Sequence, residues 1–166
     1  YHIKLMHSRA SASSTARDKN RLGLIEATLQ AISELGYANA SVSEIIKNAG
    51  LSRGMIHLHF GSKNNLVIEA AIHASERYHA FLETCLKCAG PSPQEQVEAI
   101  VNNDLSENVL NATSVSVWYE LRGAIYFQKE LASYSDIRDE RLQSVLFRLF
   151  CELSKSYDLN DATKEN

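Results

Sequence analysis

Proline, the strongest helix breaker, occurs at only two positions in this chain of 166 residues, Pro91 and Pro93. No stretch shows the sustained alternation of apolar and polar residues that is typical of a half-buried strand. The sequence therefore predicts an all-α protein that is helical from about Asn20 onward and is interrupted by a loop at residues 89–93.

Apolar residues recur at helical spacing on both sides of this loop. The first predicted helix ends at Gly36 and carries one apolar stripe, made of Leu22, Ile25, Leu29, Ile32 and Leu35. A long helix is expected to begin behind Ser62 as N-cap and to run from Lys63 to the mid-80s. Three further amphipathic helices, around residues 97–105, 115–127 and 142–153, are typical of a packed bundle.

Residues 36–66 fit two very short helices with a tight turn between them. The first has an apolar face and can be capped by Ser41 or Ser43. Gly50 suits a left-handed turn position, and Ser52 can cap a second helix that ends near Phe60. This is the pattern of a helix-turn-helix motif, in which the second helix enters the major groove of DNA.

The early and outward positions of that second helix are therefore candidate DNA contacts: Ser52, Arg53, Gly54 and His57. Ile56 and Phe60 are expected to face inward. Glycine at position 54 would let the helix approach the duplex closely. Arg53 could donate a bidentate pair to guanine or could equally bind phosphate.

The charge distribution agrees with such a surface. Residues 1–63 carry 8 Lys and Arg against 4 Asp and Glu, whereas residues 64–166 carry 9 against 16. A basic front half on an acidic body is what a nucleic-acid contact needs, because neutralising phosphates supplies much of the affinity.

The run from Leu24 to Leu66 contains Ile-Glu-Ala-Thr-Leu, Ala-Gly-Leu-Ser-Arg-Gly, His-Phe and Ser-Lys-Asn-Asn-Leu. With these elements it resembles the amino-terminal DNA-binding domain of the TetR family of bacterial regulators. The resemblance implies a three-helix helix-turn-helix domain over residues 20–62. The Ser- and Ala-rich composition of residues 8–16 predicts that residues 1–19, which precede this domain, form a disordered arm. A long helix would join it to a helical ligand-binding and dimerisation bundle over residues 63–166.

For function, the resemblance implies a cytoplasmic transcriptional repressor without a cofactor. Such a regulator binds a palindromic DNA operator as a homodimer, and a small-molecule effector of unknown identity releases it. By the same resemblance Ser43 joins the base-facing set, Lys63 contacts phosphate, and Arg17, Lys19 and Arg21 reach the backbone or minor groove. His59 is a further candidate contact, with local packing or capping as its alternative.

The family often has aromatic residues at the positions of His57 and Leu58, and Leu58 cannot replace a tyrosine hydroxyl on a phosphate. Within the family the chain is most similar to choline-responsive repressors of glycine betaine synthesis. Their aromatic-rich Trp-x-x-Phe-Trp run is reduced here to its first member, Trp118. A choline pocket therefore does not follow from the resemblance.

Aromatic residues could still form an effector site in the body. A cage for a quaternary ammonium group would use Trp118, Tyr119, Tyr126 and Phe127 together with Glu120. Aromatics at helical spacing are more often simple core, so this alternative stands beside the cage.

Other classes of protein fit less well. No apolar run approaches the ~20 residues that cross a bilayer, which argues against an integral membrane protein. Three cysteines imply no disulfide framework and favour a reducing, cytoplasmic setting, and Cys85 and Cys88 lack the second pair that a zinc site needs. No nucleophile, metal set or phosphate loop indicates an enzyme.

Relatives in the family continue with another long apolar helix, whereas this chain ends in the polar residues 158–166. The last family helix is thus expected to be absent. This leaves an alternative function, in which a truncated family member acts as an interaction or decoy module with weak DNA binding.

Overall fold

The computed structural model describes the backbone of residues 2–125 and 129–156, and the side chains of residues 15–125, 129–131 and 139–155. These residues form helices and no strand, so the predicted all-α class is confirmed. The helices are α1 (His2–Leu35), α2 (Val42–Ala49), α3 (Arg53–Phe60), α4 (Lys63–Cys88), α5 (Pro93–Asp104), α6 (Ala112–Ala124) and α7 (Lys129–Ser156).

Helices α2 and α3 form the predicted helix-turn-helix. Ser41 caps α2, because its hydroxyl accepts a hydrogen bond from the Glu44 N–H at 3.2 Å. Gly50 ends α2 with a φ of 63°, a left-handed conformation that suits glycine. Ser52 occupies the N-cap position of α3, as expected. Its side chain makes no capping hydrogen bond, however.

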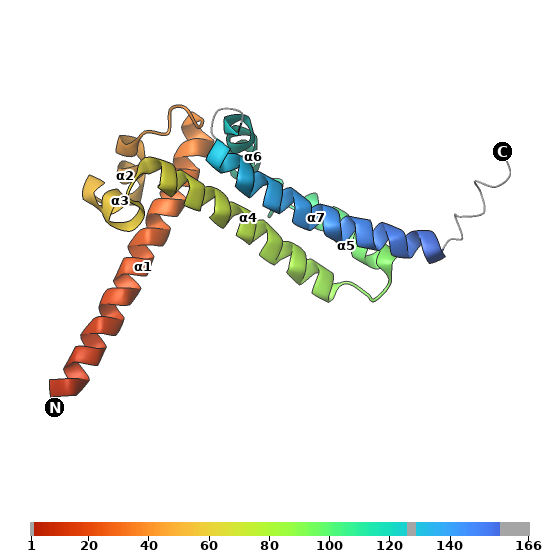
Figure 1. Cartoon of the computed structure of the whole chain (residues 1–166), viewed down its shortest axis with the longest axis horizontal. Helices are drawn as coiled ribbons and strands as arrows, with labels where there is room; N and C mark the ends of the chain where they lie inside the picture. The colour runs from red at the N-terminus through yellow and green to blue at the C-terminus, as the bar shows by residue number, and fades with distance from the viewer. Residues whose placement is uncertain (1, 126–128, 157–166) are drawn as a thin grey trace.

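Helix α1 is longer than the sequence analysis expects. A disordered arm is predicted over residues 1–19, whereas the structure continues the helix back to His2, and this part projects away from the rest of the molecule (Figure 1). Residues 2–22 contain no proline or glycine, and extending an existing helix needs no new nucleus. The predicted apolar stripe is buried in its middle, whereas Leu22 and Leu35 at its ends are exposed.

The long helix α4 joins the helix-turn-helix to the bundle. It begins where predicted, behind Ser62, whose hydroxyl accepts from the Asn65 N–H at 3.1 Å. Helices α5 and α7 pack along α4, whereas α6 packs against α1 at the end of the bundle that faces the helix-turn-helix (Figure 1). Helix α5 starts at Pro93 behind a capping box of Ser92 and Glu95.

Buried apolar side chains form two clusters. The larger one, which we call the proximal core, joins α1–α4 to α6 and to Leu131 of α7. The smaller one, the distal core, contains Leu82 of α4, Ile100 of α5 and Leu149 of α7. The amphipathic pattern of the predicted helices around residues 97–105 and 142–153 includes three apolar residues that are exposed instead: Val101, Leu105 and Phe150. Among the described helices, none combines the length and the apolar character needed to cross a membrane.

Candidate nucleic-acid interface and effector cavity

The exposed face of α3 carries the predicted DNA contacts. Arg53, Gly54 and His57 are exposed, whereas Ile56 and Phe60 are buried in the proximal core. Gly54 opens onto free space, because a Cβ atom added there would meet only the Ser52 hydroxyl, at 3.9 Å. Arg53, Gly54 and His57 thus lie on the outward side of α3 and Ile56 and Phe60 on its inward side, as the spacing predicts.

Basic side chains from two helices meet beside this face. Arg53 and His57 of α3 and Lys63 at the start of α4 line a small hollow of about 170 Å³. Val42 and Ile56 form its apolar floor. We call this feature the basic hollow. A concave surface with positive charge from several directions is suited to an anion.

The remaining DNA-binding candidates lie in different environments. Ser43 on α2 and Arg17 and Lys19 on α1 are exposed. Arg21 is instead half-buried, since its guanidinium pairs with Glu69 at 2.6 Å and lies 5.4 Å from the centre of the Phe60 ring. It joins α1 to α3 and α4 and is not free on the surface.

His59 also points away from the exposed face of α3. Its Nε2 atom is enclosed and has no hydrogen-bond partner among the described residues, and its ring lies 6.1 Å from that of Phe60. This position favours the alternative of local packing. Leu58, in contrast, is 62% exposed on the outer side of the helix. Its exposure on this side makes Leu58 a further candidate contact, which its outward place in the helical spacing could have indicated.

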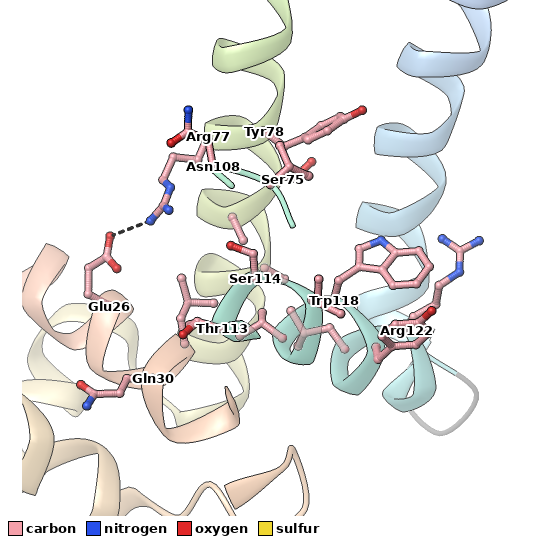
Figure 2. Close-up of a pocket in the computed structure, with 18 of the residues that line it drawn as sticks. Glu26, Gln30, Ser75, Arg77, Tyr78, Asn108, Thr113, Ser114, Trp118 and Arg122 are labelled. Atoms are coloured by element: carbon pink, nitrogen blue, oxygen red, sulfur yellow. Dashed lines mark ion pairs between the residues drawn. The ribbon is translucent and has the colours of Figure 1, made fainter. Parts of the chain in front are cut away.

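A cavity of about 810 Å³ lies between α1, α4 and α6 and reaches α7 (Figure 2). Its polar lining comes from several elements: Glu26 and Gln30 of α1, Ser75, Arg77 and Tyr78 of α4, Asn108 of the α5–α6 loop, and Thr113, Ser114, Trp118 and Arg122 of α6. Apolar side chains such as Leu29 and Val117 complete it. The mixture of apolar and polar groups is typical of a small-molecule site.

Two of the aromatic residues predicted for the cage, Trp118 and Tyr119, lie beside this cavity. Trp118 and Tyr119 both line it and pack edge to face, with ring centres 4.8 Å apart. The face of Trp118 is covered by Arg122, whose Cζ atom lies 5.1 Å from the ring centre (Figure 2). Arg122 is itself paired with Asp139 at 2.8 Å. The other predicted cage aromatics, Tyr126 and Phe127, lie outside the described residues.

Glu120, a further residue of the predicted effector site, is not among the residues that line this cavity. Its carboxylate accepts a hydrogen bond from the Tyr37 backbone N–H at 2.6 Å. Tyr37 follows Gly36, the glycine that ends α1 with a φ of 79°. The N–H at this position commonly bonds back to its own helix, so a carboxylate from α6 replaces that helix end contact.

A second bond strengthens this contact between α6 and the end of α1. The Ser116 hydroxyl donates to the Ser33 carbonyl at 3.1 Å. We call the bonds of Glu120 and Ser116 the α6 latch. Burial raises the pKa of the phenol of Tyr37, whose backbone N–H takes part in the latch. The latch could not be read from the sequence, because its partners are 83 residues apart.

Ion pairs tie α1 to α4 near the edge of the cavity. The Glu26 carboxylate lies 3.1 Å from His73 Nε2 and 3.8 Å from the Arg77 guanidinium, and Figure 2 marks the latter pair. The cysteines lie away from this region. The Cys85 thiol donates to the buried Asn103 side chain at 3.4 Å, whereas Cys88 is exposed.

Comparison with known proteins relates these features to regulators. Residues 24–70 match the family model described as bacterial regulatory proteins, tetR family. The chain is 35% identical over 130 residues to the HTH-type transcriptional regulator BetI of Stenotrophomonas maltophilia, covering 78% of this chain and 66% of that protein. It is 30% identical to BetI of Escherichia coli O139:H28 over 132 residues, covering 78% and 67%.

A solved structure agrees with this similarity over the same extent of chain. The crystal structure of a putative transcriptional regulator from Pseudomonas aeruginosa PAO1 superimposes with a TM-score of 0.75 at 25% identity, over 82% of this chain and 65% of that one. The chain thus spans about two thirds of the length of the curated relatives that it matches.

Proposed function

The chain belongs to the tetR family of bacterial regulatory proteins, and from this premise we propose that it is a ligand-responsive repressor that binds a palindromic operator as a homodimer. The family is one of transcriptional regulators and not of enzymes. A regulator of bacterial genes acts where the chromosome lies, so we propose a cytoplasmic location.

The proposed DNA contact uses the exposed face of α3. Residues at i and i+4 lie above one another on a helix, so Arg53 and His57 form one row and Gly54 and Leu58 form the next. The first row borders the basic hollow and is suited to phosphate. The second row, with no side chain at Gly54 and an apolar one at Leu58, is suited to close contact with base edges, including the thymine methyl group.

Ligand response is supported by the two roles of helix α6, and this is the observation that carries the proposal. Trp118 and Arg122 of α6 line the cavity, while Glu120 and Ser116 of the same helix form the latch with α1. An effector that binds the cavity better in one position of α6 would shift the helix-turn-helix with it. The long helix α4, which also lines the cavity and begins at the basic hollow, offers a second route.

The chemistry of the cavity bears on the effector. The indole face of Trp118 already holds the guanidinium of Arg122, so a quaternary ammonium ligand would have to displace that cation. Gln30, Asn108 and Ser114 offer neutral hydrogen-bonding groups beside an apolar wall. We propose a small effector that combines an apolar body with polar groups, and not a simple cation.

Homodimer formation would use α7. Phe147 and Phe150 of this helix are 73% and 56% exposed, and apolar side chains of this size are usually covered when they lie close together. We propose that a second copy of the chain covers them. In such a dimer the two α3 helices would meet successive major grooves, about 34 Å apart.

The proposal is tested by mass and DNA binding together. Light scattering after size-exclusion chromatography gives the oligomeric state, and fluorescence anisotropy gives the affinity for mixed-sequence duplex DNA across a salt series. A dimer whose affinity falls steeply with salt is expected. Operator selection and an effector screen, including choline, would follow. A monomer without DNA binding would contradict the repressor and favour the decoy module.

A further inference from the structure

The basic hollow contains a histidine whose ring is fixed by the backbone. The Nδ1 atom of His57 lies 2.9 Å from the carbonyl oxygen of Gly61. A carbonyl oxygen only accepts hydrogen bonds, so Nδ1 must carry the proton of this bond. In the neutral imidazole the other nitrogen, Nε2, is then unprotonated and presents a lone pair.

A lone pair is the wrong partner for a phosphate. The phosphodiester oxygens of DNA are acceptors with negative charge, so they attract Arg53 and Lys63 but repel an unprotonated Nε2. Once protonated, Nε2 becomes a charged donor, while Nδ1 keeps its bond to Gly61. The ring therefore need not move in order to change from repelling a phosphate to binding it.

The lining of the hollow supplies no negative charge, so the charge that stabilises a protonated His57 would come from a bound phosphate. Its lining consists of Arg53, His57 and Lys63 with the apolar Val42 and Ile56, and contains no carboxylate. On the adjoining α2, Glu44 pairs with Lys47 at 3.5 Å, and it is not part of the lining. Lys63, which lines the hollow, is also the first residue of α4, and the N-terminal end of a helix favours an anion.

We propose that the basic hollow binds one phosphodiester of the DNA backbone and that His57 takes up a proton from solvent when it does so. The proton is added at Nε2, and the resulting N–H donates to a phosphate oxygen. This inference rests on the proposed DNA binding, and it adds that binding is coupled to the uptake of a proton. Because the bound form is the protonated one, affinity is highest at acidic pH and falls as the pH rises.

The size of the effect follows from linkage. Histidine side chains change charge between about pH 5 and 8, and uptake of one proton changes affinity by at most about tenfold per pH unit. We expect binding at pH 8 to be about tenfold weaker than at pH 6, at constant ionic strength. This figure is for one hollow; a dimer that uses both of its hollows would bind about a hundredfold more weakly at pH 8 than at pH 6.

The experiment uses the full chain and a mixed-sequence duplex, since phosphate contacts do not depend on sequence. Anisotropy titrations from pH 6 to pH 8 measure the affinity, and calorimetry at pH 7 in two buffers of different ionisation enthalpy counts the protons taken up. His57→Gln keeps a hydrogen-bond donor that does not titrate, and His57→Phe removes the donor. His73→Gln, on α4 and outside the hollow, controls for other histidines.

The proposal expects proton uptake by the wild type and by His73→Gln, and none by either His57 variant. His57→Gln should bind with an affinity that does not vary from pH 6 to pH 8, and His57→Phe should bind less tightly than wild type at pH 6. Uptake that persists in His57→Gln, or a wild type whose DNA affinity ignores pH, overturns the protonation while leaving DNA binding intact.

Two further outcomes separate the possible failures. If no variant binds DNA at any pH, the proposed function fails, and the inference fails with it. If inorganic phosphate without DNA produces the same proton uptake, the hollow is a site for free phosphate and its assignment to the DNA backbone is overturned. Because His57 is exposed, its substitution should leave the fold intact, which circular dichroism can check.

Discussion

At the scale of single residues, the two rows on the exposed face of α3 have different chemistry. The row of Arg53 and His57 shares the basic hollow with Lys63, whereas the row of Gly54 and Leu58 offers no charge. Contacts to phosphate add affinity for every duplex, and contacts to base edges add preference for one sequence. Substitutions in the two rows should therefore change different measured quantities.

We expect Arg53→Ala and Lys63→Ala each to weaken binding to all duplexes by about 1–3 kcal/mol and to reduce the salt slope by about one. Leu58→Ala should keep the slope and lose about 1 kcal/mol of preference for thymine, because it removes an apolar contact. Anisotropy titrations with selected and mixed duplexes measure both. Lys47→Ala, an exposed cation on α2, is the control. An Arg53→Ala variant with unchanged operator affinity would show that the proposed docking is wrong.

At the scale of helices, α6 makes two kinds of contact: it forms hydrogen bonds with the end of α1, and it lines the cavity. In the latch, the Glu120 carboxylate of α6 accepts a hydrogen bond from the Tyr37 N–H just after α1, although the two residues are 83 positions apart. A glycine is required at Gly36, since its φ is 79° and a Cβ atom there would lie 3.1 Å from the Glu120 carboxylate. We therefore expect a change in the position of α6 to be transmitted to the turn between α1 and α2.

Glu120→Ala should leave the half-buried Tyr37 N–H without its acceptor and lower the free energy of unfolding by about 1–3 kcal/mol. Glu120→Gln keeps a carbonyl acceptor and should cost less. Hydrogen exchange provides the local measurement, because the Tyr37 amide should lose protection in Glu120→Ala. Glu34→Ala, which removes only an exposed bond to Gln30, should leave that amide unchanged. Unaltered protection of Tyr37 in Glu120→Ala would rule out the latch.

At the scale of the whole molecule, the proximal and distal cores stabilise different parts of the protein. The proximal core unites the helix-turn-helix with α6, so it links the DNA-binding surface to the cavity. The distal core holds α4, α5 and α7 together at the other end of the bundle. Damage to the distal core should therefore loosen the bundle more than the DNA-binding domain.

Leu149→Ala removes a fully buried side chain from the distal core and should lower the free energy of unfolding by about 2–5 kcal/mol. The loss should not depend on protein concentration. Phe147→Ala lies on the same helix but is 73% exposed, so it should reduce only the part of the stability that rises with concentration through dimer formation. Urea denaturation followed by circular dichroism at two concentrations separates these cases. Equal losses in the two variants would contradict the assignment of the two faces of α7.

Much of the fold could be predicted because it depends on residues close together in the chain. The caps at Ser41 and Ser62, the stops at Gly36 and Gly50 and the helix-turn-helix itself involve neighbours within one or two helical turns. The outward face of α3 followed from the same short spacing. The N-terminal extension of α1 was not predicted, because its Ala- and Ser-rich residues neither start nor stop a helix strongly.

The all-α class, the family, and the ends of the short helices of the helix-turn-helix could thus be predicted from the amino-acid sequence, because capping, periodicity and glycine conformation act locally. Three contacts could be seen only once the helices were placed in space: Arg21 with Glu69, Glu120 with the end of α1, and Arg122 with Trp118. These long side chains find partners across packed helices, and their partners depend on how the helices cross in space. Helical spacing defines the face on which a residue lies, but tertiary packing selects what that face meets.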